Sequence, residues 1–386
     1  MKTKKLVMIP GPTPVVRSIQ DQMGRETVAF GDPDFVKDYK DLLTDMKEMW
    51  GTSGEVFVIA GTGTMAMEMA IANTLKAGDN LLIVSQGFFG DRFIDLCKRK
   101  GINVDIIGSE WGTIVPVADI EAKLKEKNYK AVTATHVDTA TGVAAPIKEI
   151  GEVISKFEDT LFIVDGVCAT AAEPEYVDEM KIDVLLTGTQ KAFGVAPGLA
   201  IVWAGPRALE RRKALGTIPE YYIDFEKWLP IMQDPSKYFA TPAINLIWAL
   251  KESVRLIKEE GLENRYKRHE KNARAMQAAL EGLGFNLLAQ KECRAVTLSN
   301  VLYMEGIDDV EFRKVLAEEG IVVAGGLGAY AGKMFRLGHM GNIDIHDMVS
   351  VIATIERALY RSGKDVELGK GVGILMKELL KQGKSE

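Results

Sequence analysis

The fold is decided by a stretch that opens with the apolar run Leu161-Phe162-Ile163-Val164 and ends that run on Asp165. A second apolar run, residues 182–186, leads into Thr187-Gly188-Thr189-Gln190-Lys191. Both runs have the length and composition of strands buried on both faces of a parallel sheet. Because α/β proteins place their chemistry at the carboxyl ends of such strands, the stretch predicts an α/β fold with an acid and an amine at one sheet edge.

An aspartate and a lysine at two strand ends fit the chemistry of pyridoxal phosphate (PLP). The lysine amine forms a Schiff base with this cofactor, and the aspartate pairs with the pyridinium nitrogen, so that the ring stays protonated and accepts electrons. Lys191 is followed by Ala192-Phe193 and does not lie in a run of charges. The pattern alone leaves two interpretations open: a PLP site, or a surface lysine and an ordinary loop acid.

Three segments resemble the class V aminotransferases of PLP fold type I, above all the alanine–glyoxylate/serine–pyruvate aminotransferase group. They are Val164–Gly166, Thr187–Ala192 and Ala196–Gly198, and the resemblance extends over nearly the whole chain. It implies a large domain with a mostly parallel central sheet and a smaller C-terminal α+β domain. It also implies PLP on Lys191 and a homodimer with shared active sites.

Length and pattern divide the chain into parts. With 386 residues, it is too long for a single small core. Residues 1–15 are too proline-rich for a helix and are expected to form an N-terminal arm. Residues 16–255 are expected to form the large PLP-binding domain and residues 256–386 the small C-terminal domain. A long helical pattern from Ala243 to about Leu283 should bridge the two.

Composition argues against several kinds of partner. A net charge of −6 disfavours nucleic acid and membrane surfaces, and the apolar runs are far shorter than a membrane span of about 18 residues. The apolar part of the N-terminus is too short for a secretory signal. The 3 cysteines lack paired spacing and the 4 histidines are scattered, which disfavours disulfides and a metal site. The expected location is the cytoplasm.

The phosphate of PLP is expected at Gly61-Thr62-Gly63-Thr64, which follows a predicted strand and precedes a predicted helix. Unpaired N–H groups and the positive end of a helix dipole favour an anion, and threonine hydroxyls add donors. A helix N-terminus without any ligand would look similar. The resemblance adds Gln190 here, and it adds Tyr238 and Thr241 from a partner subunit.

Other cofactor contacts come from the resemblance. Phe89 is expected to stack on the pyridine ring, and Thr139, in a segment similar to Thr-His-x-Glu-Ser-x-Thr-Gly, is expected to contact the cofactor. The expected cofactor-binding residues are therefore Gly63, Thr64, Phe89, Thr139, Asp165, Gln190, Lys191, Tyr238 and Thr241, of which Lys191 and Asp165 are catalytic.

The substrate is expected to meet Arg336 and Gly11. Arg336 lies in a strand-like run that ends in glycines, an unusual place for a guanidinium without a partner. The resemblance implies that it grips the substrate α-carboxylate bidentately, with the backbone at Gly11 nearby. Where relatives often carry His-Arg, this chain has Phe30-Gly31. That departure touches the substrate side, so substrate preference does not transfer directly.

The sequence thus predicts a PLP-dependent aminotransferase that moves an amino group from alanine or serine to glyoxylate or pyruvate. The mechanism is ping-pong, and Lys191 serves as base and acid. The alternative within the fold is a class V lyase such as a cysteine desulfurase, which needs a reactive cysteine in a flexible loop. A dinucleotide-binding protein would need a fuller glycine fingerprint than Gly61-Thr62-Gly63. A non-catalytic subunit would not need Lys191, Asp165 and Arg336 intact.

Overall fold

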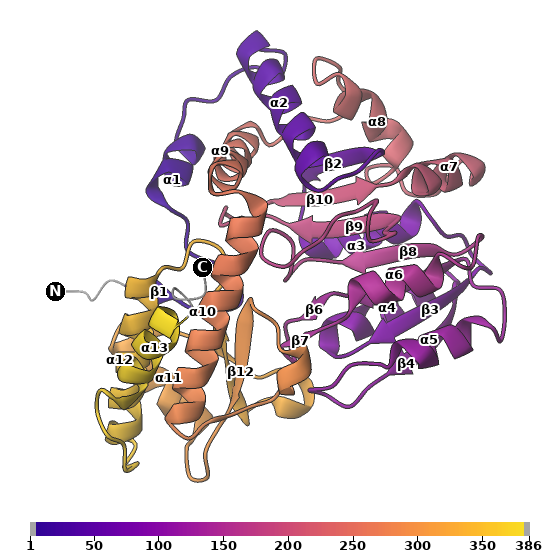
Figure 1. Cartoon of the computed structure of the whole chain (residues 1–386). Helices are drawn as coiled ribbons and strands as arrows, with labels where there is room; N and C mark the ends of the chain where they lie inside the picture. Colours follow the sequence, from indigo (N-terminus) through magenta and orange to yellow (C-terminus); the bar gives the residue numbers. More distant parts are fainter. Residues whose placement is uncertain (1–4, 382–386) are drawn as a thin grey trace.

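The computed structural model describes residues 5–381, and its centre is a seven-stranded sheet (Figure 1). The strand order is β2-β10-β9-β8-β5-β3-β4. Strand β10 runs antiparallel to β2 and β9, and the other adjacent pairs are parallel. The strands span Glu55–Ala60 (β2), Asn80–Ser85 (β3), Asn103–Gly108 (β4), Ala131–Thr135 (β5), Leu161–Asp165 (β8), Val184–Gly188 (β9) and Leu199–Ala204 (β10).

The middle strands β5, β8, β9 and β10 are buried along their whole length. Their continuous apolar runs follow from that position, because helices cover a parallel sheet on both faces. The predicted α/β fold with a mostly parallel central sheet is confirmed. The helices around this sheet are α1 (Arg17–Met23), α2 (Pro33–Met49), α3 (Gly63–Ala72), α4 (Phe88–Arg99), α5 (Val117–Leu124), α6 (Ile147–Ile154), α7 (Pro206–Ala214) and α8 (Phe225–Gln233).

A second, antiparallel sheet has the order β11-β12-β15-β14 and its own hydrophobic core. Its strands are Asn286–Leu287 (β11), Leu298–Leu302 (β12), Ala324–Gly325 (β14) and Met334–Gly338 (β15). Helices α11 (Asp309–Glu318), α12 (Ile345–Arg361) and α13 (Lys370–Lys381) complete this part. The domain boundaries predicted from sequence stay a prediction. The hydrophobic cores of the two parts are separate clusters.

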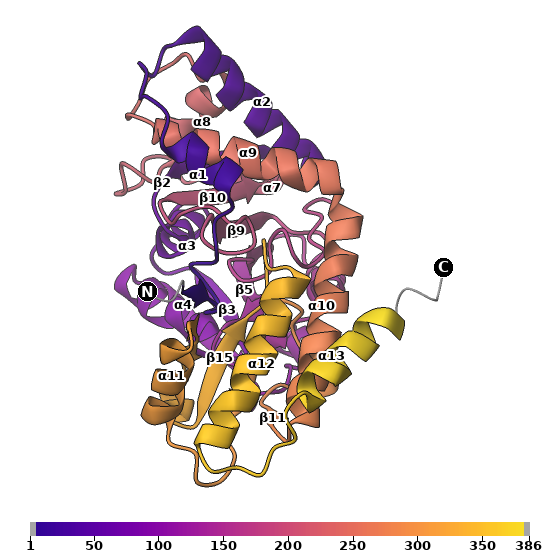
Figure 2. The same ribbon diagram turned by 90° about the vertical axis from the view of Figure 1, so that its left-hand side faces the viewer.

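Two helices, α9 (Ile244–Glu260) and α10 (Leu262–Gly282), connect the parts (Figures 1 and 2). The prediction of one continuous helix from Ala243 to about Leu283 is wrong, because the structure has two helices there. Gly261 separates the two helices with φ of +81°, a left-handed angle that favours glycine and cannot continue a right-handed helix. Figure 2 shows that α10 turns away from α9 and runs down beside α12 and α13.

The chain before α1 is anchored on the C-terminal part of the molecule. Strand β1 (Leu6–Val7) pairs in parallel with β13 (Ile321–Val322), and the N–H of Gly338 donates to the carbonyl of Met8 over 2.8 Å. Residues 1–4 of the predicted arm lie outside the described residues. The remaining short elements are β6 (Val137–Asp138), β7 (Val143–Ala144), η1 (Lys291–Cys293) and η2 (Gly328–Tyr330).

No helix within residues 5–381 is long and apolar enough to cross a membrane. Nor does this range contain a group of three or more His, Cys, Asp or Glu side chains that could hold a metal ion.

Candidate active site

A cavity of about 300 Å³ lies at the edge of the large sheet where β2, β3, β5, β8 and β9 end. Most of the residues predicted from sequence line it together: Gly11, Gly63, Thr64, Phe89, Thr139, Asp165, Gln190 and Lys191. They converge because the carboxyl ends of parallel strands meet at one edge.

Asp165 ends β8 and is buried, with 3% of its surface exposed. One carboxylate oxygen accepts a hydrogen bond from the N–H of Val167 over 2.9 Å. Burial raises the pKa of Asp165 to about 7, the negative charges of Asp138 and Glu175 act in the same direction, and Lys191 opposes them. Such a carboxyl group would be stabilised as an anion by a cationic N–H partner in the cavity.

Lys191 follows β9, and its amine donates to the carbonyl of Pro10. Burial lowers the pKa of this amine, and the positive charge of Arg336 adds to the lowering. A lower pKa favours the neutral, nucleophilic amine. The lysine is also held by the chain before α1, because the hydroxyl of Thr13 donates to the carbonyl of Lys191 over 2.7 Å.

Gly11 passes directly over the lysine side chain. A Cβ at this position would lie 2.5 Å from Cδ of Lys191, and the backbone φ is +117°. Both observations favour glycine. The predicted proximity of Gly11 to the reacting groups agrees with this packing, although its contact with substrate stays a prediction.

The first turn of α3 supplies the anion-binding features of the cavity. Its N-cap, Thr62, makes no side-chain capping bond, so the N–H groups of this turn are available. Sequence analysis missed Arg92, whose guanidinium donates to the hydroxyl of Thr64 over 3.0 Å and lies 4.8 Å from the centre of the Phe89 ring. Arg92 lies three residues after Phe89, about one turn along α4, and this spacing was the available signal.

Asp138 was also missed, and it organises the aromatic side of the cavity. This fully buried carboxylate accepts from the N–H groups of Phe89 at 2.9 Å, Gly90 at 3.1 Å and Ala140 at 2.8 Å. It therefore ties the turn that carries Phe89 to the turn that carries Thr139. Burial raises the pKa of Asp138, and the three backbone donors oppose that rise.

Two polar atoms in the cavity wall are available for a ligand. Within residues 5–381, the hydroxyl of Thr135 and the side-chain oxygen of Gln190 are buried without a hydrogen-bond partner. Buried polar groups without partners are costly. Together with the anion-binding turn, the Phe89 ring, the buried acid and the amine, they fit PLP as the bound group.

Three predicted residues do not line this cavity. Arg336 lies on β15, and its Nε donates to the carbonyl of Gly325 over 2.7 Å. Tyr238 is 58% exposed, and its hydroxyl lies 3.3 Å from that of Thr241. The ring of Tyr238 packs against the ring of Phe30, with 4.8 Å between the two ring centres. The exposed positions of Tyr238 and Thr241 agree with a contact to a second subunit, which stays a prediction. The contact of Arg336 with the substrate carboxylate also stays a prediction.

The cysteines offer little support for the desulfurase alternative. Cys97, Cys168 and Cys293 are free and buried. Burial raises the pKa of the thiols of Cys97 and Cys293, to about 12 for Cys97, so both are poor nucleophiles. Cys168 lines the cavity but lies in the buried turn that follows Asp165, not in a flexible loop.

Comparisons with known proteins agree on one family. Residues 21–343 match the family model described as aminotransferase class-V. An uncharacterized aminotransferase of Methanocaldococcus jannaschii is 38% identical over 98% of both chains. The serine–glyoxylate aminotransferase of Arabidopsis thaliana is 34% identical over 95% of this chain and 93% of its own. The solved ureidoglycine–glyoxylate aminotransferase of Bacillus subtilis, 31% identical, covers 98% of both chains with a TM-score of 0.92.

Proposed function

The chain belongs to the aminotransferase class V family, and we propose from this premise that it moves the amino group of alanine or serine to glyoxylate or pyruvate. Its fold is PLP fold type I and its cofactor is pyridoxal 5′-phosphate. The observation that carries the proposal is the pairing of buried Asp165 with a lysine of lowered pKa, Lys191, in one cavity.

Each part of the cavity would hold a different part of the cofactor. Lys191 would hold it covalently through its amine, and Asp165 would pair with the ring nitrogen. The phosphate would meet Gly63, Thr64 and Gln190, and Phe89 and Thr139 would contact the ring. When bound, PLP supplies an electron-withdrawing ring that stabilises negative charge at the substrate α-carbon.

Three side chains of the protein would carry out proton transfer, ring protonation and substrate orientation. The amine of Lys191 takes the α-proton and returns it as general base and acid, a role that its lowered pKa favours. Asp165 keeps the ring nitrogen protonated by remaining an anion beside it. Arg336 orients the substrate through its α-carboxylate.

The donor and the acceptor use the same groups in turn. Both carry a carboxylate next to the reacting carbon, so Arg336 and Lys191 would serve first the amino acid and then the keto acid. This sharing supports a ping-pong order.

The test is a panel of alanine, serine and aspartate, each with glyoxylate and with pyruvate, in which formation of the new amino acid is measured. We expect transfer from alanine or serine and weaker transfer from aspartate. Lys191→Ala is the inactive control, and Lys148→Ala, an exposed lysine, is the matched active one. Preference for aspartate, or no transfer from alanine and serine, would contradict the proposal.

A further inference from the structure

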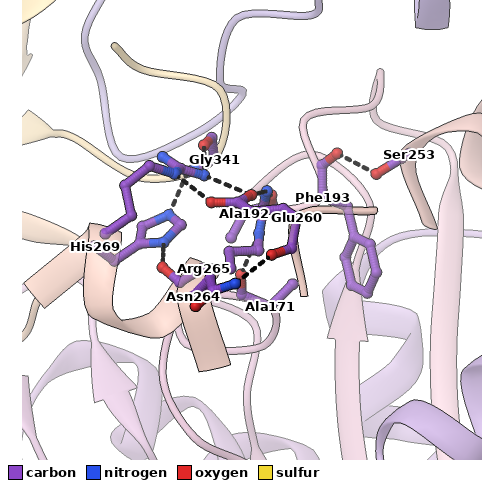
Figure 3. A network of polar contacts seen from close by, with 10 residues as sticks. Ala171, Ala192, Phe193, Ser253, Glu260, Asn264, Arg265, His269 and Gly341 are labelled. Atoms are coloured by element: carbon purple, nitrogen blue, oxygen red, sulfur yellow. Dashed lines mark hydrogen bonds and ion pairs between the residues drawn. The ribbon is translucent and has the colours of Figure 1, made fainter. Parts of the chain in front are cut away.

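A buried arginine in the first turn of α10, Arg265, donates to backbone carbonyls of two separate segments, at Ala171 and Ala192 (Figure 3). Arg265 is 3% exposed and uses all three guanidinium nitrogens. Its Nε donates to the carbonyl of Ala171 over 2.8 Å, and its Nη2 to the carbonyl of Ala192 over 2.6 Å. Its Nη1 donates to the carboxylate of Glu260 over 2.9 Å.

The two carbonyls belong to the segments that carry the proposed catalytic groups. Ala192 directly follows Lys191, and Ala171 lies in the buried turns that follow Asp165. Ala171 has φ of +70°, a left-handed angle that a residue with a Cβ rarely adopts. Such a conformation persists where its surroundings hold it, and the bond from Arg265 is one such restraint.

Arg265 is itself held in place from several directions. Glu260 accepts from Arg268 at 2.6 and 3.2 Å as well as from Arg265. Burial raises the pKa of Glu260, but the bonds and charges of Arg268 and Arg265 outweigh burial, and the net pKa lies below its usual range. Burial lowers the pKa of Arg265 to about 10, so the guanidinium is charged at neutral pH.

The next turn of α10, with Arg268 and His269, contacts the segment beyond Arg336. The N–H of Gly341 donates to Nε2 of His269 over 2.9 Å, and the carbonyl of Gly341 accepts from Arg268 over 3.1 Å. Nδ1 of His269 lies 2.8 Å from the carbonyl of Arg265. Burial and the neighbouring arginines lower the pKa of His269 well below its usual range, so the ring is neutral, with one nitrogen as donor and one as acceptor.

We propose that Arg265 is a positioning residue for the reaction: it fixes the backbone beside Lys191 relative to the turns after Asp165, and so sets how the amine faces the carboxylate. The inference rests on the proposed roles of these two side chains. A side chain that only filled space would not need a planar fork aimed at two carbonyls. Removal of the fork would leave both carbonyls without this donor.

The experiment compares Arg265→Met and Arg265→Lys with Arg274→Met in the PLP-loaded protein. Arg274 is an arginine of the same helix with a 63% exposed side chain paired with Glu270, so its variant controls for a lost surface ion pair. The readouts are kcat and KM, the pH midpoint of the visible absorption band, and the rate at which borohydride fixes the cofactor to Lys191. The last two report the surroundings of Lys191 without any substrate.

We expect Arg265→Met to lower kcat roughly tenfold to a hundredfold, as misplaced reacting groups do, with a smaller change in KM. The band midpoint and the trapping rate should move with kcat. Arg265→Lys should recover part of the loss, and Arg274→Met should match the unmodified protein. Circular dichroism checks folding, and if the methionine variant does not fold, the lysine variant is judged by the same criteria.

A second substitution tests the restraint on Ala171 directly. Glycine adopts a positive φ without a steric cost, so Ala171→Gly should restore part of the kcat lost in Arg265→Met. An unchanged band midpoint and trapping rate in a folded Arg265 variant would overturn the inference. So would the absence of any recovery in the double variant.

The experiment separates failure of this inference from failure of the proposed function. If the unmodified protein binds PLP at Lys191 but transfers no amino group in the panel, the proposed function fails and the spectroscopic comparison still decides the role of Arg265. If the unmodified protein is active and the Arg265 variants behave like Arg274→Met, only the inference fails.

Discussion

The predicted site has two parts: one part lines the cavity at the edge of the large sheet, and the other lies outside that cavity. Asp165 ends β8 and Lys191 follows the adjacent strand β9, and both line one cavity. Arg336 lies on the second sheet and Tyr238 is 58% exposed, and neither lines the cavity. Strand ends are positioned by the topology of one sheet, whereas the other residues depend on how a second sheet or a second subunit approaches.

The largest effect of a substitution on turnover is expected at Asp165, in the part of the site that the large sheet supplies. Asp165→Asn removes the anion that would pair with the ring nitrogen, and breaking a buried charged pair on one side costs about 3–5 kcal/mol. We expect kcat with alanine to fall by roughly two to three orders of magnitude or more. Asp159→Asn, at an exposed acid paired with Lys130, is the control. Near-normal turnover would remove Asp165 from the proposed mechanism.

Asp165 should support turnover but lower the stability of the cofactor-free protein at neutral pH. The folded-state pKa of Asp165, about 7, lies above the unfolded value of about 3.9, so the folded state binds a proton more tightly. The free energy of unfolding should therefore decrease as pH rises from about 4 to about 7, by up to roughly 4 kcal/mol.

Thermal unfolding of the cofactor-free protein across this pH range measures the effect. Asp165→Asn has no such proton to lose, so its curve should be flatter between these limits and its Tm higher near neutral pH. Equal slopes for the two proteins would show that the carboxyl group does not titrate as its burial requires.

The second sheet should contribute a smaller effect that concerns substrate. Arg336→Lys exchanges a two-pronged donor for a point charge, and loss of one charge-assisted bond is worth about 1.5–3 kcal/mol. The KM for the amino donor and for the keto acid should rise together, and the PLP spectrum should change little. Arg313→Lys, at an arginine paired with Asp309, is the control. Loss of PLP with an unchanged KM would place Arg336 in the cofactor site.

The smallest effect per residue is expected at the exposed pair Tyr238 and Thr241. Substituting both by alanine would remove two hydrogen bonds to a charged phosphate supplied across the proposed dimer, each at the low end of about 1.5–3 kcal/mol because both donors are neutral and solvent-exposed. PLP affinity should fall accordingly. Mixing this variant with Lys191→Ala should then restore activity at a PLP concentration that loads neither parent, because the mixed dimer holds one complete site. No recovery after proven subunit exchange would contradict a shared site.

Local patterns were sufficient to predict which residues of the large sheet lie together in one cavity. The apolar runs before Asp165 and Lys191 and the turn at Gly63 and Thr64 each carry their signal within a few residues. Arg92 and Asp138 were missed because their importance comes from packing between segments: Arg92 reaches back to Thr64, and Asp138 reaches the turn of Phe89.

Helix α10 shows the same limit from another direction. In sequence, Arg265 looks like one of many charged residues on a solvated helix, but the break at Gly261 turns it inward. The glycine was visible in the sequence, and its φ of +81° explains the break. The direction of the second helix after the break is set by tertiary contacts, which no local pattern contains.

The pairing of β1 with β13 has a consequence for the order of assembly during synthesis. Leu6 lies opposite Ile321, so the strand that leads to Gly11 finds its partner more than 300 residues later in the chain. The large sheet needs nothing beyond Ala204 for its strands, and a nascent chain could form it early. The arm that carries Gly11 would still lack the anchor that β1 receives from β13. The active site should therefore be finished late in biogenesis, and PLP would meet its complete binding surface after most of the chain has emerged.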